Sequence, residues 1–343
     1  MRLTRQWRIG KFMSGRLALL GLAVALVTAA GCGGGGSSGG GASTGGGKGD
    51  GEYTLGVDYL GLQFPYEVAL QNAVEDQASK EGIKLIQLDA KTDPSTELAN
   101  MESLIAKKPD AILFNGLDVK ASGASLKLAE AAGIPVVTFS TVIRGPQKAW
   151  SGSYNHQSGA ESGKWLLKQA DKANGKKLKV LYLQGIPGHP AFVARKAGML
   201  KEIGDRQDEF AFTPKVADFD RAKGLRATEE ALAAGEFDAI VAQNDEMALG
   251  ALQVLEERGL TSKIKLLGGD GDPEALKAVA DGKMAGTILQ DAEQQGTWAV
   301  KLAKKYLDTG KVESVHETPF VLIDTPEGAA DILPAVKALY GDN

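Results

Sequence analysis

The chain has 343 residues, 43% of them hydrophobic, with 39 basic and 43 acidic side chains. Five of the basic residues and none of the acidic ones lie in the first 31 positions, so removing that segment leaves 34 basic against 43 acidic side chains. This acidic balance argues against a nucleic-acid partner, which needs a basic face. A single cysteine and three scattered histidines offer no zinc-type cluster, and we expect neither a metal nor a cofactor.

Residues 1–31 are typical of a secretory signal peptide. A basic leader ending at Arg16 precedes the apolar run Leu17–Ala30, which is too short for a comfortable membrane span. The run leads into Ala29-Ala30-Gly31-Cys32, which resembles the lipobox of bacterial lipoproteins, although Ala29 stands where that motif usually has leucine. The resemblance implies that Cys32 carries the lipid; the alternative is a plain secretory signal.

Residues 32–50 are dominated by glycine and serine, and this composition predicts a flexible tether rather than a folded domain. We therefore expect the body of the protein to be extracytoplasmic, and to be held to the cell membrane only through the N-terminal lipid. About 290 residues remain, which is enough for two domains of ordinary size.

The first half of this body alternates between short apolar runs and amphipathic segments. Strands are predicted at Tyr53–Val57, Ile83–Leu88, Ala111–Asn115 and Pro135–Phe139. Helices are predicted at Pro65–Glu81, after the N-cap Asp93 with an apolar stripe of Leu98, Met101, Leu104 and Ile105, and near Ala124–Ala132. This alternation indicates a doubly wound, parallel α/β sheet.

The second half repeats the pattern. Strands are predicted at Leu178–Leu183, Phe210–Val216, Ala239–Ala242, Lys265–Gly268 and Ala285–Leu289. Helices are predicted at Pro190–Ile203, Arg221–Ala233 and Met247–Arg258, and after each of the last two strands. Two α/β lobes of this kind leave a ligand cleft between them.

Polar side chains follow several of these strands. Asn244 comes directly after the strand Ala239–Ala242, and Asp270 lies in a glycine-flanked loop beyond the strand that begins at Lys265. Open α/β sheets bind small molecules at the carboxyl edge of their strands. The sequence therefore predicts a ligand site at this edge.

Three segments carry a resemblance to a known family: ADFDRAKGL at Ala217–Leu225, AIVAQNDEMALGA at Ala239–Ala251 and GGDGDPE at Gly268–Glu274. With most of the chain beyond residue 52, they resemble the bacterial periplasmic sugar-binding proteins of the ribose-binding type. The resemblance implies two Rossmann-like lobes joined by three crossings, near Ser153–Asn155, Gln290–Asp291 and Pro319–Val321. It places residues 51–154 and 291–320 in an N-terminal lobe, and residues 155–290 and 321–343 in a C-terminal lobe.

The same resemblance implies roles for five residues of the C-terminal lobe. Asn244 and Asp270 would bond sugar hydroxyls, Arg195 would contact the sugar, Phe219 would stack on it, and Gln290 would sit at a crossing. Amides and charged groups bond hydroxyls well, and an aromatic ring covers the apolar face of a sugar. Taken one at a time, these residues have plainer alternatives as helix caps, loop residues, a surface ion pair or core.

The N-terminal lobe departs from the family pattern. Phe64-Pro65-Tyr66-Glu67 stands where such sugar binders often have Asn-Pro-Phe-Phe, and Ser140-Thr141 replaces their usual Asp-Arg pair. His189 matches galactose-type relatives, but Ala191 replaces the acidic residue that they have two positions later. We predict that these side chains line the site, and a pentose, hexose, polyol or deoxy-sugar all stay open as ligands. Further candidates to line the cleft or support the hinge are Tyr59, Trp150, Tyr154, Asn155 and Phe192.

The expected function is that of a monomeric, lipid-anchored receptor that closes on a sugar and delivers it to the permease of an ABC importer. The alternative is a receptor of the same fold that passes a sugar or an autoinducer to a chemotaxis or sensor-kinase system. We expect no catalysis, because no Gly-x-Gly-x-x-Gly follows the first strand and no nucleophile sits beside a histidine in a recognisable context. Regulators of the lactose-repressor type begin with a DNA-binding domain, where this chain has a secretory leader.

Overall fold

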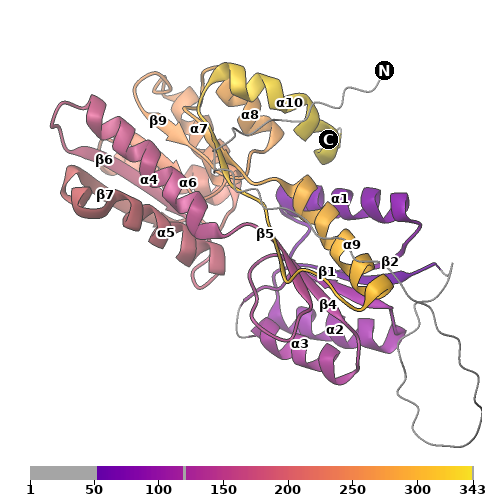
Figure 1. The fold of residues 1–343 in the computed structure, drawn as a ribbon. Helices are drawn as coiled ribbons and strands as arrows, with labels where there is room; N and C mark the ends of the chain where they lie inside the picture. The colour runs from indigo at the N-terminus through magenta and orange to yellow at the C-terminus, as the bar shows by residue number, and fades with distance from the viewer. Residues whose placement is uncertain (1–51, 119–120, 342–343) are drawn as a thin grey trace, which may run out of the picture. The chain divides into compact units, whose positions relative to one another are not determined.

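The computed structural model describes residues 52–118 and 121–341, in which strands and helices alternate (Figure 1). The predicted signal peptide, the tether and Cys32 lie outside the described residues. Among the helices of the described part, none combines the length and the apolar character needed to cross a membrane.

The first sheet has six strands, all paired in parallel, in the order β11-β5-β4-β3-β1-β2. Its strands are β1 (Thr54–Tyr59), β2 (Lys84–Asp89), β3 (Ala111–Phe114), β4 (Val136–Ser140), β5 (Ala149–Gly152) and β11 (Val315–Glu317). The four strands predicted for this half are present, whereas β5 and β11 were not anticipated from the sequence.

Helices cover both faces of this sheet (Figure 1). They are α1 (Pro65–Glu81) with α9 (Ala292–Thr309) on one face, and α2 (Pro94–Lys107) with α3 (Ala121–Ala131) on the other. Met101 and Leu104 of the predicted α2 stripe are fully buried, but Leu98 is 39% exposed. Glu97 points inward in that turn of α2. Leu98 is exposed because it is the next residue and lies about 100° further round the helix.

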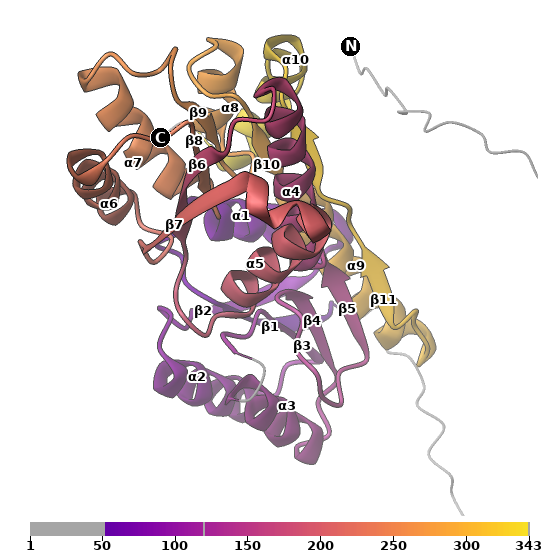
Figure 2. The ribbon, with the colours of Figure 1, turned by 90° about the vertical axis from the view of Figure 1, so that its left-hand side faces the viewer.

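The second sheet has four parallel strands in the order β7-β6-β8-β9 (Figure 2). They are β6 (Leu178–Gln184), β7 (Phe210–Val216), β8 (Ala239–Ala242) and β9 (Lys265–Leu267). A short antiparallel pair, β10 (Thr287–Leu289) with β12 (Val321–Ile323), is linked to this edge by a bridge between Leu267 and Gly286. The fold class predicted from the sequence, two parallel-sheet α/β lobes, is confirmed.

Helices also cover both faces of the second sheet. One face is covered by α4 (Asn155–Lys172) and α5 (Pro190–Ile203), and the other by α6 (Arg221–Ala234) and α7 (Asp245–Glu257). The 3₁₀ helix η1 (Gly204–Glu209) follows α5, and α8 (Pro273–Ala280) packs against the last helix, α10 (Pro326–Tyr340). Neither α4 nor α10 was anticipated from the sequence.

Helices α4 and α5 approach each other unusually closely. A Cβ atom added at Gly159 would lie 2.0 Å from the carbonyl oxygen of Arg195, and one added at Gly198 would lie 2.0 Å from that of His156. Glycine lowers helix propensity, which obscured α4 in the sequence, but it permits the backbone contact that sets Arg195 beside the start of α4.

Three segments connect the two sheets: β5 leads into α4 at residues 153–154, β10 into α9 at 290–291, and β11 into β12 at 318–320. The three-segment hinge expected from the family resemblance is therefore present. Two of these segments are joined by a hydrogen bond of 2.5 Å from Ser153 Oγ to the carbonyl of Thr318. Ser153 Oγ also accepts from Gln295 Nε2 of α9 at 2.8 Å. The exact lobe boundaries stay a prediction.

Candidate functional site

One pocket is lined by residues from both sheets' strand ends and from the helices that follow them. It encloses about 680 Å³ of space between the side chains, part of which is open to solvent. All eleven residues predicted to bind ligand line it: Phe64, Tyr66, Glu67, Ser140, Thr141, His189, Arg195, Phe219, Asn244, Asp270 and Gln290.

The loop that presents Asp270 is held by a buried carboxylate beneath it. Asp245, fully buried at the start of α7, accepts hydrogen bonds of 2.8 Å from the backbone N–H groups of both Gly271 and Asp272. It also accepts from Thr287 Oγ1 at 2.7 Å. Asp270 adopts a φ of 136°, a strained conformation that these contacts over-determine. Asp245 is thus a scaffold for the loop that presents Asp270 to the pocket.

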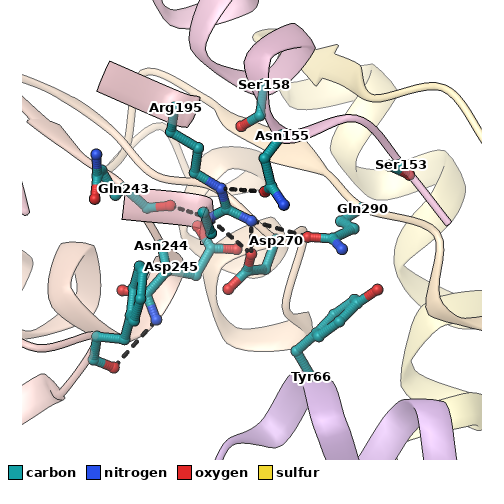
Figure 3. Close-up of polar contacts among 12 residues, drawn as sticks. Tyr66, Ser153, Asn155, Ser158, Arg195, Gln243, Asn244, Asp245, Asp270 and Gln290 are labelled. Atoms are coloured by element: carbon teal, nitrogen blue, oxygen red, sulfur yellow. Dashed lines mark hydrogen bonds and ion pairs between the residues drawn. The ribbon is translucent and has the colours of Figure 1, made fainter. Parts of the chain in front are cut away.

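Arg195 occupies the centre of the polar cluster (Figure 3). Its Nε donates to Asn155 Oδ1 at 2.9 Å, Nη2 donates to Gln290 Oε1 at 2.9 Å, and Nη1 donates to the carbonyl of Gln243. Nη1 and Nη2 both donate to Asp270 Oδ1, at 3.3 and 3.2 Å. A guanidinium has five N–H donors, and these five bonds engage all of them. Direct donation from Arg195 to a ligand would require one of these bonds to be exchanged.

The groups fixed by Arg195 keep polar atoms free to bond a ligand. Asp270 Oδ2, Gln290 Nε2 and Asn155 Nδ2 make no hydrogen bond to any described residue, and all three residues line the pocket. Together they offer a carboxylate acceptor and two amide donors. A ring bearing several hydroxyl groups matches this combination, because each hydroxyl both donates and accepts.

Asn244 is both a helix cap and a pocket residue. Its Oδ1 accepts from the backbone N–H of Met247 at 3.1 Å and caps α7, while Nδ2 donates to the carbonyl of Phe219 at 3.1 Å. The cap interpretation that the sequence left open therefore holds. It does not exclude ligand contact, because the amide nitrogen has a second hydrogen.

Phe219 and His189 form the apolar wall of the pocket. Phe219 has a φ of 59° and meets the His189 ring edge-on, with the ring centroids 5.6 Å apart. His189 caps α5 by accepting from the backbone N–H of Ala191 at 3.1 Å. Burial, with the charge of Arg195 adding to it, lowers the pKa of His189 to about 4, so this ring is neutral at pH 7.

The first lobe contributes the N-terminal turn of α1 and the end of β4. Glu67 is buried, and both of its oxygens accept from Asn115 Nδ2, at 3.0 and 2.8 Å. Asn115 Oδ1 in turn accepts from the backbone N–H of Thr141 at 3.2 Å. The Tyr66 hydroxyl donates to Gln295 Oε1 at 2.9 Å, which links the pocket to the hinge hydrogen bonds. The carboxylate of Glu67 thus enters a pocket wall that lacks basic residues.

Burial dominates the electrostatics of the pocket carboxyl groups. It raises the pKa of Glu67 to about 8, while the amide of Asn115 opposes the shift. It also raises the pKa of Asp270 in spite of the nearby Arg195, and it raises that of Asp272. Glu246, which also lines the pocket, forms a two-point ion pair with Arg221 at 3.1 and 2.7 Å.

Several lining residues were not assigned to the site from the sequence. Asp272 directly precedes Pro273 at the start of α8, but its side chain makes no cap hydrogen bond and instead accepts from the Tyr340 hydroxyl at 2.7 Å. Asn155, one of the further candidates to line the cleft or support the hinge, lines the pocket beside Arg195. The other candidates of that group are not among the lining residues: Tyr59, Trp150, Tyr154 and Phe192.

The donor set is suited to hydrogen bonding rather than to metal binding. Among the described residues, no group of three or more histidine, cysteine, aspartate or glutamate side chains is arranged to hold a metal ion. The amide and carboxylate groups of the pocket instead alternate with apolar rings, as in receptors for small polar molecules.

A family model described as a periplasmic binding protein domain matches residues 60–311. The chain belongs to the periplasmic binding protein family. The ribose import binding protein of Escherichia coli K12 is 36% identical over 264 residues, which cover 76% of this chain and 87% of that protein. The predicted likeness to the ribose-binding type is confirmed, and family membership implies an extracytoplasmic location.

Solved structures share the same architecture. An ABC transporter solute binding protein from Bacillus halodurans C-125 with bound myo-inositol superposes with a TM-score of 0.76, at 30% identity over 84% of this chain and 99% of that one. A galactofuranose binding protein superposes with a TM-score of 0.78 at 26% identity, and the aligned region covers 84% of this chain and 100% of that one.

Proposed function

We propose that the chain is the sugar receptor of an ABC importer: a monomeric lipoprotein that binds a pentose, a hexose or a related polyol and delivers it to the permease. The proposal is carried by one observation, the meeting of all eleven predicted ligand-binding residues in a single pocket. The pocket presents a free carboxylate oxygen and free amide N–H groups, which match sugar hydroxyls.

The ligands named for relatives support a polyhydroxylated substrate. The three proteins described above are named for ribose or galactofuranose, or were crystallised with myo-inositol. These molecules share a small ring with several hydroxyl groups and differ in ring size and substitution. The class of ligand therefore carries over as a proposal, whereas the individual sugar does not.

The hinge supports a closing mechanism. The pocket takes residues from both lobes, and three segments connect them, so closure on a ligand would bury it and bring the two walls together. We assign the protein no catalytic role, because the family to which it belongs consists of binding proteins. Anchoring through Cys32, outside the described residues, is part of the proposal.

A thermal-shift panel of pentoses, hexoses and polyols tests binding, with calorimetry on every hit. A ligand at a concentration of 100 times its Kd should stabilise the protein by about 2.7 kcal/mol. A panel in which no sugar or polyol raises the melting temperature would contradict the sugar assignment. Uptake of the labelled sugar by cells that lack the gene separates import from signalling, since a purely signalling receptor would leave uptake unchanged.

A further inference from the structure

Glu67 is a pocket carboxyl group that has no cationic partner among the described residues. Glu67 is only 5% exposed. Among the described residues, its carboxyl oxygens accept hydrogen bonds only from Asn115 Nδ2, which belongs to a neutral amide. The residue is at the start of α1, and the pocket wall around it is formed by Tyr66, Ser140 and Thr141, none of which is basic.

No basic residue of the opposite wall is available to compensate Glu67. Arg195 is the sole lysine or arginine among the lining residues, and its hydrogen bonds go to Asp270 and to three amide oxygens. Glu246 is already paired with Arg221. Asp272, the remaining carboxyl group, is bonded by the Tyr340 hydroxyl. The lining of the pocket therefore contains more carboxyl groups than cationic groups.

A buried carboxylate in this position either holds a proton or attracts a cation. Burial favours the proton, because it raises the pKa of Glu67 to about 8, and the carboxylates of Asp270 and Asp89 raise that pKa further. A sugar hydroxyl would offer Glu67 a neutral hydrogen bond. An ammonium group would offer charge-assisted hydrogen bonds, which are roughly twice as strong as neutral ones.

We propose that the ligand is a cationic polyol, an aminodeoxy sugar or an aminocyclitol, whose ammonium group binds Glu67 while its hydroxyl groups bind Asp270, Gln290 and Asn155. This inference rests on the proposed function, since it assigns a substrate class to the same pocket. It places the charge-selecting residue in the first lobe and the hydroxyl-binding residues in the second.

Calorimetry on the purified protein at pH 7 tests the inference with matched ligands. The amines are D-glucosamine, D-galactosamine, 3-amino-3-deoxy-D-ribose and scyllo-inosamine, each compared with its hydroxyl parent and its N-acetyl derivative. For at least one set, the amine should bind at least tenfold more tightly than the parent, and N-acetylation should remove the advantage. Parents that bind as tightly as their amines in every set would overturn the inference and leave the sugar function standing. Absence of binding by both classes would overturn both.

Substitutions test whether Glu67 is the residue that causes a preference for the amine over its hydroxyl parent. Glu67→Gln should reduce the amine-to-parent ratio to less than threefold. Glu75→Gln makes the same change on the exposed side of α1 and should leave the ratio unaltered. An unchanged ratio in Glu67→Gln would overturn the role of Glu67. The N-acetyl comparison uses the unaltered protein, so it remains decisive if Glu67→Gln does not fold, as judged by circular dichroism.

Discussion

Arg195 and Asp270 form a buried ion pair in which the guanidinium binds only one of the two carboxylate oxygens. Both Nη atoms donate to Oδ1, at 3.3 and 3.2 Å, and Oδ2 is left to face the pocket. Arg195 also holds Asn155, the first residue of α4 after the segment 153–154, and Gln290, which lies in the segment 290–291. The same side chain therefore orients pocket-facing groups of Asp270, Asn155 and Gln290 and connects them to the start of α4 and to the segment 290–291.

The first prediction concerns Asp270. Asp270→Asn keeps an oxygen for Arg195 but replaces the free carboxylate acceptor by an amide donor. Ligand affinity should fall at least tenfold, which corresponds to about 1.4 kcal/mol. The melting temperature should fall as well, because the buried guanidinium of Arg195 loses its anionic partner, although it keeps its bonds to Gln290, Asn155 and the Gln243 carbonyl. Calorimetry with the ligand found in the panel measures the effect, and exposed Asp76→Asn is the control. Equal affinities in the two variants would refute a ligand contact by Asp270.

The close contact of α4 with α5 gives a second prediction. Gly159→Ala would place a Cβ 2.0 Å from the Arg195 carbonyl oxygen, so the two helices must separate. We expect a loss of about 1–3 kcal/mol in the free energy of unfolding, as for other overpacked sites. Affinity should also fall, because Arg195 moves away from Asn155.

Gly123→Ala is the matched control for Gly159→Ala. Gly123 also lies in a helix, but an added Cβ would meet its nearest neighbour, the Arg144 carbonyl oxygen, at 3.7 Å, an ordinary contact distance. Alanine should therefore be neutral or stabilising there. Urea unfolding of both variants gives the comparison, and similar stabilities would show that the α4–α5 contact tolerates separation.

A third prediction addresses the membrane anchor. If Cys32 is the lipid-bearing residue, Cys32→Ser should move the protein from the membrane fraction to the soluble fraction of lysed cells. Ligand affinity should not change, because the pocket is built from residues between 60 and 290. Persistent membrane association of Cys32→Ser in fractionated cells, detected by immunoblotting, would argue against the lipobox.

The sequence predicts which residues line the pocket better than it predicts the hydrogen bonds that join them. Asn244 and Asp270 could be located because each follows a parallel strand of the second sheet, and these strand ends meet at one edge. Gln290 follows β10, which pairs antiparallel with β12, and its place in the site comes from the family resemblance alone. The hydrogen bonds of Arg195 to Asn155 and Gln290 could not be predicted, because these residues lie 40 and 95 positions away along the chain and no local pattern links them.

The unanticipated helices have different explanations. The glycines of α4 lower its helix propensity, and the close contact with α5 that they permit is not visible in the sequence. The last helix, α10, contains Pro334, and its Tyr340 bonds Asp272 across 68 positions. Pairings of this kind arise only when the chain has folded, so propensity and periodicity cannot reveal them.

The last prediction concerns Asp58, which is fully buried at the end of β1. Its Oδ1 accepts from Asn100 Nδ2 at 2.7 Å, and Oδ2 has no partner among the described residues. Burial raises the pKa of Asp58 to about 8, the carboxylates of Glu97 and Asp89 add to the shift, and the Asn100 amide opposes it.

The sign of the pH dependence follows from this shift. Between the ordinary aspartate pKa of 3.8 and about 8, Asp58 keeps a proton in the folded state that it loses in the unfolded state. The stabilisation is therefore complete below the lower value, and it is lost as the pH rises through the upper one. The free energy of unfolding should fall by up to about 1.4 kcal/mol per pH unit from this group. Asp58→Asn should remove that slope between pH 5 and 7, whereas Asp76→Asn should not. Urea unfolding across this range measures the slope, and identical slopes in Asp58→Asn and the unaltered protein would show that Asp58 is ionised when folded.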